Sequence, residues 1–443
     1  MVDLVSVCSV ASASGPWRSY AVAAGVVVIV LATTNTWNPF PRLWNWVNTS
    51  APIAAGAAQW QQRIGGSPQS VTIADDAVIV EYRTSVEAYG LGAGVKLWQS
   101  DADWAAVAGT DADAVVVTGR LLIRGYQVLE PRTGVVRRQD TTATAVWTYQ
   151  NAIVDLHCAK GSDCELTAWD PRGSQPLWTV STGGIGFVLN ASNPDLPDTK
   201  PLTSPQVDDD VAGPPFMPGL IGLPDDGRVR IVDTAGGKVV QTVAPRSDQR
   251  VAVAGGRVLT VTGTARDGTC YYGVVATDPP SGQRVWSRDG LNLRTADNGS
   301  SCKQDRDPAG GSDVVLGVDP VGRRELLAAH DGRVLWHGAK DEDVLAVDDG
   351  FAVIRNADRD TLTGRSFNGA GTVWQRSAGS GTTAALTPYA VIVAGLKPSR
   401  ITAMSRSDGR VLADIRTPAK VFAAGPRGLI VVSGRDMAYL PFR

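Results

Sequence analysis

The chain has 443 residues, of which 43% are hydrophobic and 19% are charged, so it can bury one large core or two medium ones. Its formal net charge is -2 and no Lys/Arg run is present, which gives no electrostatic reason to expect a nucleic acid partner. Gly (48) and Pro (26) are frequent, and long amphipathic patterns are missing after about residue 50. This composition favours many short strands over helices, and we expect an all-β fold.

An apolar run near the N-terminus differs from the rest of the chain. Ala21 to Ala32 read AVAAGVVVIVLA without a polar side chain, and Trp17 and Trp37 bracket the run like interfacial anchors. The distance from Trp17 to Trp37 along a helix is roughly 30 Å, about the hydrocarbon thickness of a bilayer. We therefore expect a transmembrane helix over residues 19–37 that acts as a signal anchor.

The charges around this run predict its orientation. Arg18 lies on its N-terminal side, and no further Lys or Arg occurs until Arg42, so the positive-inside rule places the N-terminus in the cytoplasm. The alternative is a cleaved signal peptide with a site at Val30-Leu31-Ala32. Both interpretations place the rest of the chain outside the cell membrane.

Four cysteines follow the apolar run, an even number that an oxidising compartment favours. Cys158 and Cys164 flank AKGSD, which is typical of a hairpin turn, so they can face each other across two paired strands. Cys270 would then pair with Cys302. Three connectivities are possible, and the short loop favours this one. A metal site at these cysteines would need CxxC-type spacing, which is absent.

A pattern of an apolar strand, a glycine turn and a second apolar strand that often ends in Trp recurs along the chain. Its copies include CELTAWDPRGSQPLW (164–178) and GVVATDPPSGQRVW (273–286). Successive turn glycines are 40, 39, 64, 45, 50, 39 and 38 residues apart, a period near 39 with three insertions. The turn glycines are Gly94, Gly134, Gly173, Gly237, Gly282, Gly332, Gly371 and Gly409. The tryptophans that end a copy are Trp98, Trp178, Trp286, Trp336 and Trp374.

Each of these copies would form the outer part of a larger unit. Most copies follow another, more apolar strand, such as DAVIVEYR (76–83) or YAVIVAG (389–395). About four short antiparallel strands in a unit of roughly forty residues are typical of one blade of a β-propeller. Radial stacking of the blades covers both faces of every sheet. We interpret the repeated Gly and Trp residues as structural, the glycines in tight turns and the rings between neighbouring blades.

The repeat resembles that of a known family. The pattern AxDxx(T/S)GxxxW, clearest in VVATDPPSGQRVW, is similar to the tryptophan-docking repeat of the pyrroloquinoline-quinone-like propellers. That family includes quinoprotein dehydrogenases and the noncatalytic outer-membrane assembly lipoprotein B. The resemblance spans roughly residues 58–443 and implies the fold without implying an activity. The layout of one N-terminal transmembrane helix and an exported propeller also resembles that of actinobacterial membrane-anchored proteins.

The number of blades follows less directly from the sequence. WQQRIGG at Trp60 resembles an isolated outer strand, and GLIVVSGRDMAYLPF near the C-terminus resembles inner strands that lack a Trp. Pairing these two segments would close the ring between the termini and give nine units. The resembled family usually has eight blades, and the unit around VRIVDTAGGKVVQ (229–241) diverges from the others. We therefore expect a single propeller of eight four-stranded blades, with seven or nine as alternatives.

Catalytic residues are scarce. No nucleophile elbow is present, and the three histidines, His157, His330 and His337, give no sign of converging on a metal or a nucleophile. The resembled quinoprotein enzymes hold their cofactor against adjacent cysteines and a calcium ion, but no two cysteines are adjacent here. We expect no catalytic residue, no cofactor and no metal.

These observations favour a noncatalytic protein of the cell envelope. We expect a membrane-anchored propeller, with its N-terminus in the cytoplasm, that presents loop faces to another envelope protein or a cell-wall polymer. The alternatives are a quinone-dependent dehydrogenase and a small-ligand sensor that uses the central channel. The expected segments are a cytoplasmic stretch (1–18), the transmembrane helix (19–37), a linker (38–57) and the propeller (58–443). The propeller contains a Pro/Asp-rich insertion at 181–215, which would form a lid, a partner-binding arm or a solvated connection.

Overall fold

The computed structural model describes most of the predicted propeller. The described residues are 53, 56–160, 163–183, 206–208, 211–293, 302, 313–369, 371–396 and 399–443. The predicted segments 1–18 and 19–37, and nearly all of the predicted linker, lie outside them. Among the described residues, no helix has the length and apolarity that a bilayer crossing requires.

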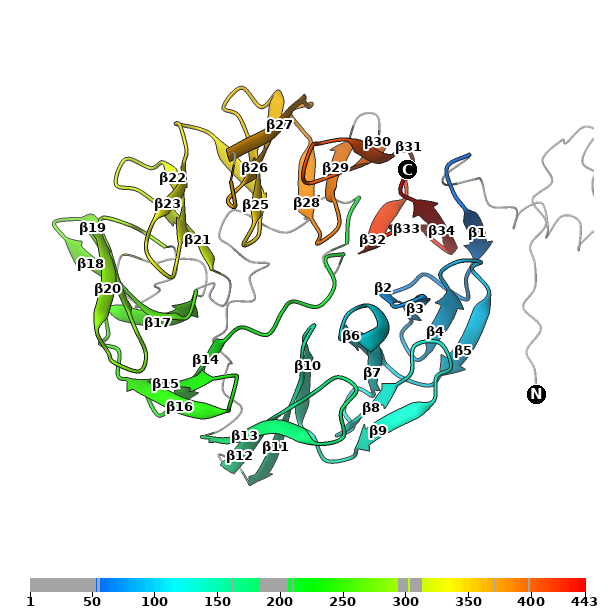
Figure 1. Ribbon diagram of the computed structural model, residues 1–443, viewed down its shortest axis with the longest axis horizontal. Helices are drawn as coiled ribbons and strands as arrows, with labels where there is room; N and C mark the ends of the chain where they lie inside the picture. Colours follow the sequence, from blue (N-terminus) through cyan, green and yellow to red (C-terminus); the bar gives the residue numbers. More distant parts are fainter. Residues whose placement is uncertain are drawn as a thin grey trace, which may run out of the picture. The chain divides into compact units, whose positions relative to one another are not determined.

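The described residues form antiparallel sheets arranged in a ring, as the expected all-β propeller requires (Figure 1). We number the sheets as blades in chain order. Blade 1 comprises β2 (Ser70–Ala74), β3 (Ala77–Glu81), β4 (Val86–Gly90) and β5 (Lys96–Ser100). Blade 2 comprises β6 (Trp104–Ala108), β7 (Val115–Gly119), β8 (Tyr126–Leu129) and β9 (Val136–Asp140), with the 3-10 turn η1 (Asp111–Asp113) between β6 and β7. Blade 3 comprises β10 (Ala145–Thr148), β11 (Ile153–Lys160), β12 (Asp163–Trp169) and β13 (Pro176–Thr182).

The next three blades contain the divergent unit. Blade 4 comprises β14 (Leu220–Asp225), β15 (Arg228–Asp233) and β16 (Lys238–Val243). Blade 5 comprises β17 (Gln249–Ala254), β18 (Arg257–Arg266), β19 (Thr269–Thr277) and β20 (Arg284–Asp289). Blade 6 comprises β21 (Val314–Val318), β22 (Arg324–Ala328) and β23 (Val334–His337). Blades 4 and 6 therefore have three strands each instead of the expected four, and in blade 6 a single antiparallel bridge between Asn292 and Val318 stands in place of the inner strand.

The last three blades complete the ring. Blade 7 comprises β24 (Asp343–Val347), β25 (Phe351–Arg355), β26 (Thr361–Ser366) and β27 (Gly371–Ser377). Blade 8 comprises β28 (Thr383–Leu386), β29 (Val391–Leu396), β30 (Ser399–Met404) and β31 (Val411–Arg416). Blade 9 comprises β32 (Lys420–Gly425), β33 (Gly428–Ser433), β34 (Asp436–Pro441) and, from the N-terminal side of the chain, β1 (Trp60–Arg63).

The hydrophobic core lies between the blades rather than at one centre. In blade 1 the second strand β3 is almost wholly buried, whereas the outer strand β5 alternates toward solvent. The buried side chains gather into clusters, each shared by two neighbouring blades; Ile79 of blade 1 and Leu129 of blade 2 belong to one of them. Such shared clusters join every consecutive pair of blades, including blades 9 and 1. Each sheet therefore buries both faces, which is what stacking in a closed ring provides.

The ring closes by strand exchange between the two ends of the described chain. β1 pairs antiparallel with β34, with Trp60 opposite Tyr439 and Arg63 opposite Asp436. In Figure 1 the N-terminal strand accordingly lies beside the C-terminal strands. The expected count of eight is wrong, because nine sheets form within the described residues. Trp60 does complete a blade, and the divergent unit around residues 229–241 forms blade 4.

Candidate functional site

The repeated tryptophans and glycines make contacts between blades. The Trp98 ring of blade 1 lies on Gly134 of blade 2, so closely that a Cβ at Gly134 would be 2.9 Å from its Cγ. The Trp98 indole N–H also donates to the carbonyl of Pro131, at 2.7 Å. The same ring-on-glycine contact joins three further pairs of the predicted repeat residues: Trp178 with Gly237, Trp286 with Gly332, and Trp374 with Gly409. These residues hold neighbouring blades together.

Other repeat positions depart from this contact. At Gly173 the preceding blade offers Arg138 instead of a Trp, and the Arg138 guanidinium donates to the Gly173 carbonyl at 3.2 Å. Arg138 also lies over the Trp169 ring, 4.5 Å from its centroid. A Cβ at Gly282 would meet no atom within 4 Å, and one at Gly371 would meet Arg365 rather than Trp336. The docking contact is therefore replaced or missing at some blade junctions of the described chain.

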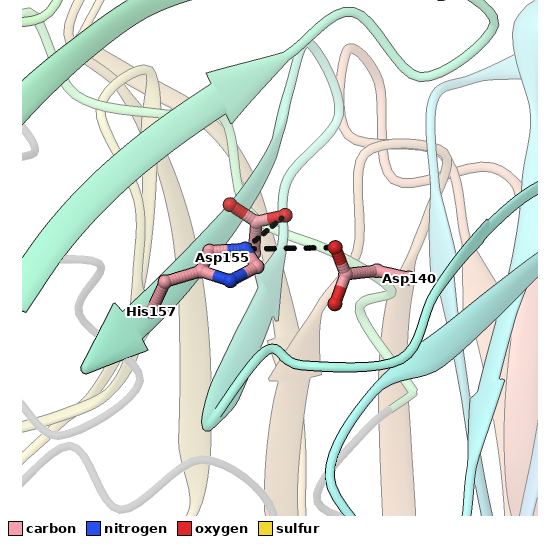
Figure 2. A group of neighbouring side chains, drawn as sticks. All are labelled: Asp140, Asp155 and His157. Atoms are coloured by element: carbon pink, nitrogen blue, oxygen red, sulfur yellow. Dashed lines mark ion pairs between the residues drawn. The ribbon is translucent and has the colours of Figure 1, made fainter. Parts of the chain in front are cut away.

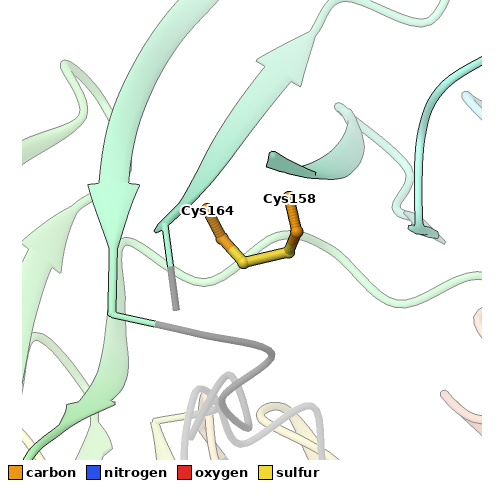
Figure 3. Close-up of a disulfide and its surroundings, with 2 residues drawn as sticks. All are labelled: Cys158 and Cys164. Carbon is orange, nitrogen blue, oxygen red and sulfur yellow. A yellow bond between two sulfur atoms is a disulfide. The ribbon is translucent and has the colours of Figure 1, made fainter. Parts of the chain in front are cut away.

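Both cysteine pairs expected from the sequence are bonded. Cys158 of β11 lies opposite Cys164 of β12 in the strand register, and their sulfurs form a disulfide (Figure 3). A second disulfide joins Cys270 of β19 to Cys302. The first bond closes a hairpin, and the second ties Cys302 in the long connection between blades 5 and 6 back to blade 5.

The described part of the predicted insertion forms an arm across the ring. At one end Val207 pairs in parallel with Val421 of β32, the innermost strand of blade 9. At the other end the Gln150 side chain, in the β10–β11 turn of blade 3, donates to the Pro214 carbonyl at 3.0 Å. Figure 1 shows this segment, in green, running across the middle of the ring toward β14. We call residues 206–208 and 211–217 the crossing arm.

The crossing arm is docked firmly on blade 9. Val207 and Val211 are 2% and 1% exposed and belong to the core cluster that blades 8 and 9 share. The Asp208 carboxylate forms an ion pair with Lys420 at 2.6 Å. Residues 206–208 and 211 are thus packed and do not form a solvated connection, whereas Ala212, Gly213 and Pro215 are exposed as that alternative requires; the rest of 181–215 lies mostly outside the described residues.

An exposed apolar loop projects from blade 2. Leu121, Leu122 and Ile123 connect β7 to β8 and are 65%, 106% and 60% exposed, with the exposed Arg120 and Arg124 on either side. Leu122 has a φ of 65°, which a bulky side chain rarely adopts. We call Leu121–Ile123 the apolar tip. The run of three apolar residues between two predicted strands is the sequence signal that could have identified it.

A second surface feature lies where the ring closes. A groove of about 780 Å³ runs between blades 9 and 1, and Leu91, Leu97, Tyr439 and Phe442 are among its lining residues. Arg427 and Asp76 form an ion pair at this groove. The groove therefore offers a second surface, with both apolar and charged side chains.

A buried glutamate in blade 1 is the shared acceptor of several side-chain hydrogen bonds. Glu87 is 6% exposed and accepts hydrogen bonds from Tyr82, Tyr89 and Lys96, the last at 2.6 Å. Burial alone would raise the pKa of Glu87, but these hydrogen bonds lower it below its ordinary value. Burial and the Glu87 charge raise the pKa of Tyr82 to about 12, so its hydroxyl keeps its proton and donates. The group is a hydrogen-bonding centre that the sequence analysis missed.

The histidines lie in two different blades, beside carboxylates. In blade 3, the His157 ring nitrogen Nε2 is 3.5 Å from Asp155 Oδ2 and 3.7 Å from Asp140 Oδ2 (Figure 2). In blade 6, His337 Nδ1 lies 2.7 Å from Glu325 Oε1. His330, also of blade 6, contacts Asp313 at 2.7 Å. Asp155 and His157 are two residues apart on one strand and so share a face, which is the signal in the sequence that could have linked this histidine to a carboxylate.

Part of the chain matches a known family model, and several solved structures are similar to it. Residues 272–423 match the family model described as outer membrane protein assembly factor BamB. BamB from Moraxella catarrhalis is similar in structure, with 17% sequence identity over 86% of this chain and 98% of that chain and a TM-score of 0.37. Quinohemoprotein alcohol dehydrogenases from Pseudomonas putida HK5 and Comamonas testosteroni show 10% and 11% identity and TM-scores of 0.36 and 0.35. The alignments cover 86% and 88% of this chain and 72% and 77% of the two enzymes.

No curated protein matches the chain. Over residues 272–423 the chain is similar to BamB by its family model, and the repeated tryptophan–glycine contacts of the propeller are consistent with a pyrroloquinoline-quinone-like repeat.

Proposed function

We propose that the protein is a noncatalytic binding or scaffold protein, a membrane-anchored β-propeller outside the cell membrane that presents a loop face to another envelope protein. The observation that carries this proposal is the apolar tip. Its three consecutive apolar side chains are 65%, 106% and 60% exposed, so the other described residues leave most of their surface in contact with solvent. Such exposed runs are unfavourable in water unless a partner covers them.

The chemistry of the tip favours a protein partner over a cell-wall polymer. Leu121, Leu122 and Ile123 offer no hydrogen-bonding side chain, whereas a polysaccharide presents mainly hydroxyl groups. Arg120 and Arg124 flank the tip and can pair with acidic groups at the rim of an apolar pocket. An apolar centre with a polar rim is the usual composition of a protein–protein contact.

The crossing arm supports a surface role in preference to a small-ligand sensor. Val207 lies on the inner face of blade 9 and the arm crosses the ring, so chain atoms occupy space that a ligand in a central channel would need. The arm is bound through buried valines and the ion pair between Asp208 and Lys420. A ligand would have to displace these contacts to bind there.

The proposed location rests on two features. The apolar run from Ala21 to Ala32, within residues 19–37, supports an anchor in the cell membrane. The two disulfides support an oxidising compartment, because thiols stay reduced in the cytoplasm.

Site-specific photo-crosslinking in intact cells tests the proposal. A photoreactive amino acid at Leu122 should give one discrete protein adduct in the envelope. Val321 is the matched control, because it is 72% exposed in the equivalent loop of blade 6. Replacing Leu121 and Ile123 with serine should weaken the adduct at Leu122. An equal adduct pattern at Val321, or none at Leu122, would contradict the proposal.

A second assay separates the scaffold from a quinone-dependent dehydrogenase. The purified full chain is mixed with the quinone and calcium, and the absorbance and the oxidation of alcohols or sugars are recorded. A scaffold should show neither saturable cofactor binding nor turnover. Saturable binding with turnover would replace the proposed function by the enzymatic one.

A further inference from the structure

We propose that Asp140, Asp155 and His157 form a binding site for a divalent first-row transition ion, such as Zn²⁺, which links blade 2 to blade 3. This inference is independent of the proposed function. Asp140 ends β9 of blade 2, whereas Asp155 and His157 lie on β11 of blade 3. One ligand atom from each of the three side chains lies within 4.8 Å of the other two.

Strand geometry brings the three groups together. Asp155 and His157 are two residues apart on β11, so their side chains leave the same face of the sheet. That face meets the end of β9, where Asp140 begins the connection between the blades. In Figure 2 both carboxylates face the same ring nitrogen of His157, and the two dashed lines meet at that atom.

Hydrogen bonds direct a lone pair of His157 toward the carboxylates. Asp140 Oδ1 accepts from the backbone N–H groups of Thr142 and Ala143, at 2.7 and 2.6 Å, and from the Thr142 hydroxyl at 3.3 Å. Because the Thr142 hydroxyl donates to Asp140, it accepts from His157 Nδ1, which lies 3.2 Å away. A neutral His157 then carries its proton on Nδ1 and turns the lone pair of Nε2 toward Asp140 and Asp155.

The Nε2 contacts have the distances of ligands around a cation. Nε2 lies 3.5 Å from Asp155 Oδ2 and 3.7 Å from Asp140 Oδ2, which exceeds the usual N–H···O distance of about 2.9 Å. Around a tetrahedral Zn²⁺ with bonds of about 2.0–2.1 Å, neighbouring ligand atoms lie about 3.3–3.4 Å apart. Shifts of a few tenths of an ångström would therefore seat the ion.

The buried carboxylate of Asp155 needs a positive charge. Its side chain is 0% exposed, and its Oδ2 accepts from the Tyr126 hydroxyl at 2.7 Å and the Trp169 indole at 2.9 Å. Its Oδ1 has no hydrogen-bond partner within the described chain, and no Lys or Arg there forms an ion pair with Asp155. The two hydrogen bonds come from neutral donors and do not balance a negative charge, whereas a divalent ion would neutralise both carboxylates.

The ligand set and its exposure fit an ion that enters from solvent. One imidazole and two carboxylates suit Zn²⁺ and its first-row neighbours, and three protein ligands leave a fourth position for water. The side chains of His157 and Asp140 are 31% and 25% exposed, so the ion can reach them from solvent. The Asp155 side chain is 0% exposed and forms the buried side of the site. The Thr142 hydroxyl orients the imidazole from behind, as groups around metal-bound histidines commonly do.

A related group in blade 6 provides a control. Asp319, Glu325 and His337 also lie close together. There, His337 Nδ1 forms a direct 2.7 Å hydrogen bond with Glu325, and Arg323 pairs with Asp319 at 2.9 Å. These direct pairs already satisfy the charges, so this group should not bind the ion.

Titration calorimetry with Zn²⁺ tests the site. The full chain is purified in detergent without a histidine tag, stripped with a chelator and titrated with ZnCl₂. We expect one saturable equivalent, with affinity at least about tenfold lower in His157→Gln and in Asp140→Asn. Asp140→Asn retains Oδ1 for the backbone N–H groups and removes only the charged ligand oxygen. His337→Gln should bind as the wild type does.

Thermal unfolding without metal and with increasing Zn²⁺ separates lost binding from misfolding. Zn²⁺ should raise the Tm of the wild type and of His337→Gln, but not that of His157→Gln, provided that all three unfold cooperatively without metal. Absence of saturable binding by the folded wild type would overturn the proposal. So would equal affinity in wild type and His157→Gln, or loss of binding in His337→Gln alone.

Discussion

Trp60 of β1 lies on Gly94, the turn glycine between β4 and β5 of blade 1. A Cβ at Gly94 would be 2.8 Å from Trp60 Cδ2, and the Trp60 indole donates to the Leu91 carbonyl at 2.7 Å. Because β1 also pairs with β34, this contact joins the C-terminal blade to the first blade. The junction between the chain ends thus uses the same contact as Trp98 and Gly134.

Substituting the glycine of this closing contact should destabilise the ring. Gly94 has a φ of +70°, which costs a residue with a Cβ about 1–2 kcal/mol, and the added methyl would also collide with Trp60. Gly94→Ala should therefore lower the free energy of unfolding by about 1–3 kcal/mol more than Gly282→Ala. Gly282 has a φ of +67° and open space around its Cα. Urea unfolding, followed by tryptophan fluorescence, measures the free energy of unfolding of both variants. Equal losses of stability would show that Trp60 does not pack on Gly94.

The closing contact also shows which parts of the fold could be predicted from sequence. The hairpins and the disulfide between Cys158 and Cys164 depend on short-range patterns, which one stretch of sequence displays completely. Pairing of Trp60 with Tyr439 depends on segments at opposite ends of the chain. The pattern suggested that pairing, but the usual size of the resembled family outweighed it in the predicted count.

The candidate sites were harder to predict for a related reason. The group around His157 combines β9 with β11, and the register between two blades cannot be read from either strand. Arg138 replaces a docking Trp through its hydrogen bond to Gly173, although the repeat pattern offers only a mismatch there. The crossing arm has no strand periodicity, because Val207 makes a single bridge rather than a ladder.

The two disulfides should differ in their contribution to stability. Cys270 and Cys302 are 32 residues apart, whereas Cys158 and Cys164 are 6 apart. By loop-closure entropy, the longer loop contributes about 4 kcal/mol and the shorter loop about 2 kcal/mol. Replacing Cys270 and Cys302 together with serine should therefore lower the free energy of unfolding more than the same change at Cys158 and Cys164. Chemical denaturation of both double variants checks the order, and the reverse order would refute the prediction.

The hydrogen-bonded Glu87 should make stability depend on pH. Its pKa in the folded chain lies below the ordinary value of 4.5, so its contribution is complete above about pH 4.5. That contribution is lost as the pH falls through the lower folded-state value. Glu87→Gln should cost about 1–3 kcal/mol at pH 7, because a charged acceptor is removed from Lys96 and two tyrosines.

The pH series for Glu87 needs a matched control. The difference in unfolding free energy between wild type and Glu87→Gln should be constant from pH 7 to about pH 5 and then shrink toward pH 3. Glu165→Gln changes an exposed glutamate on β12 and should leave the curve unchanged. A difference that persists unchanged at pH 3 would mean that the charge of Glu87 is not what stabilises blade 1.

The apolar tip should contribute to partner binding but not to the stability of the folded chain. Leu122 is fully exposed and holds a φ of 65°, so it gains nothing from burial and carries the strain of a left-handed backbone. Asparagine tolerates this conformation better, and Leu122→Asn should raise the free energy of unfolding by up to about 1 kcal/mol. Leu129→Ala, at a site 2% exposed in the same blade, should lower the free energy of unfolding by about 2–5 kcal/mol.

The same Leu122→Asn variant should also lose its partner. With a photo-crosslinker placed at Leu121, this variant should not form the envelope adduct. An adduct of full yield would show that the tip contributes no binding energy.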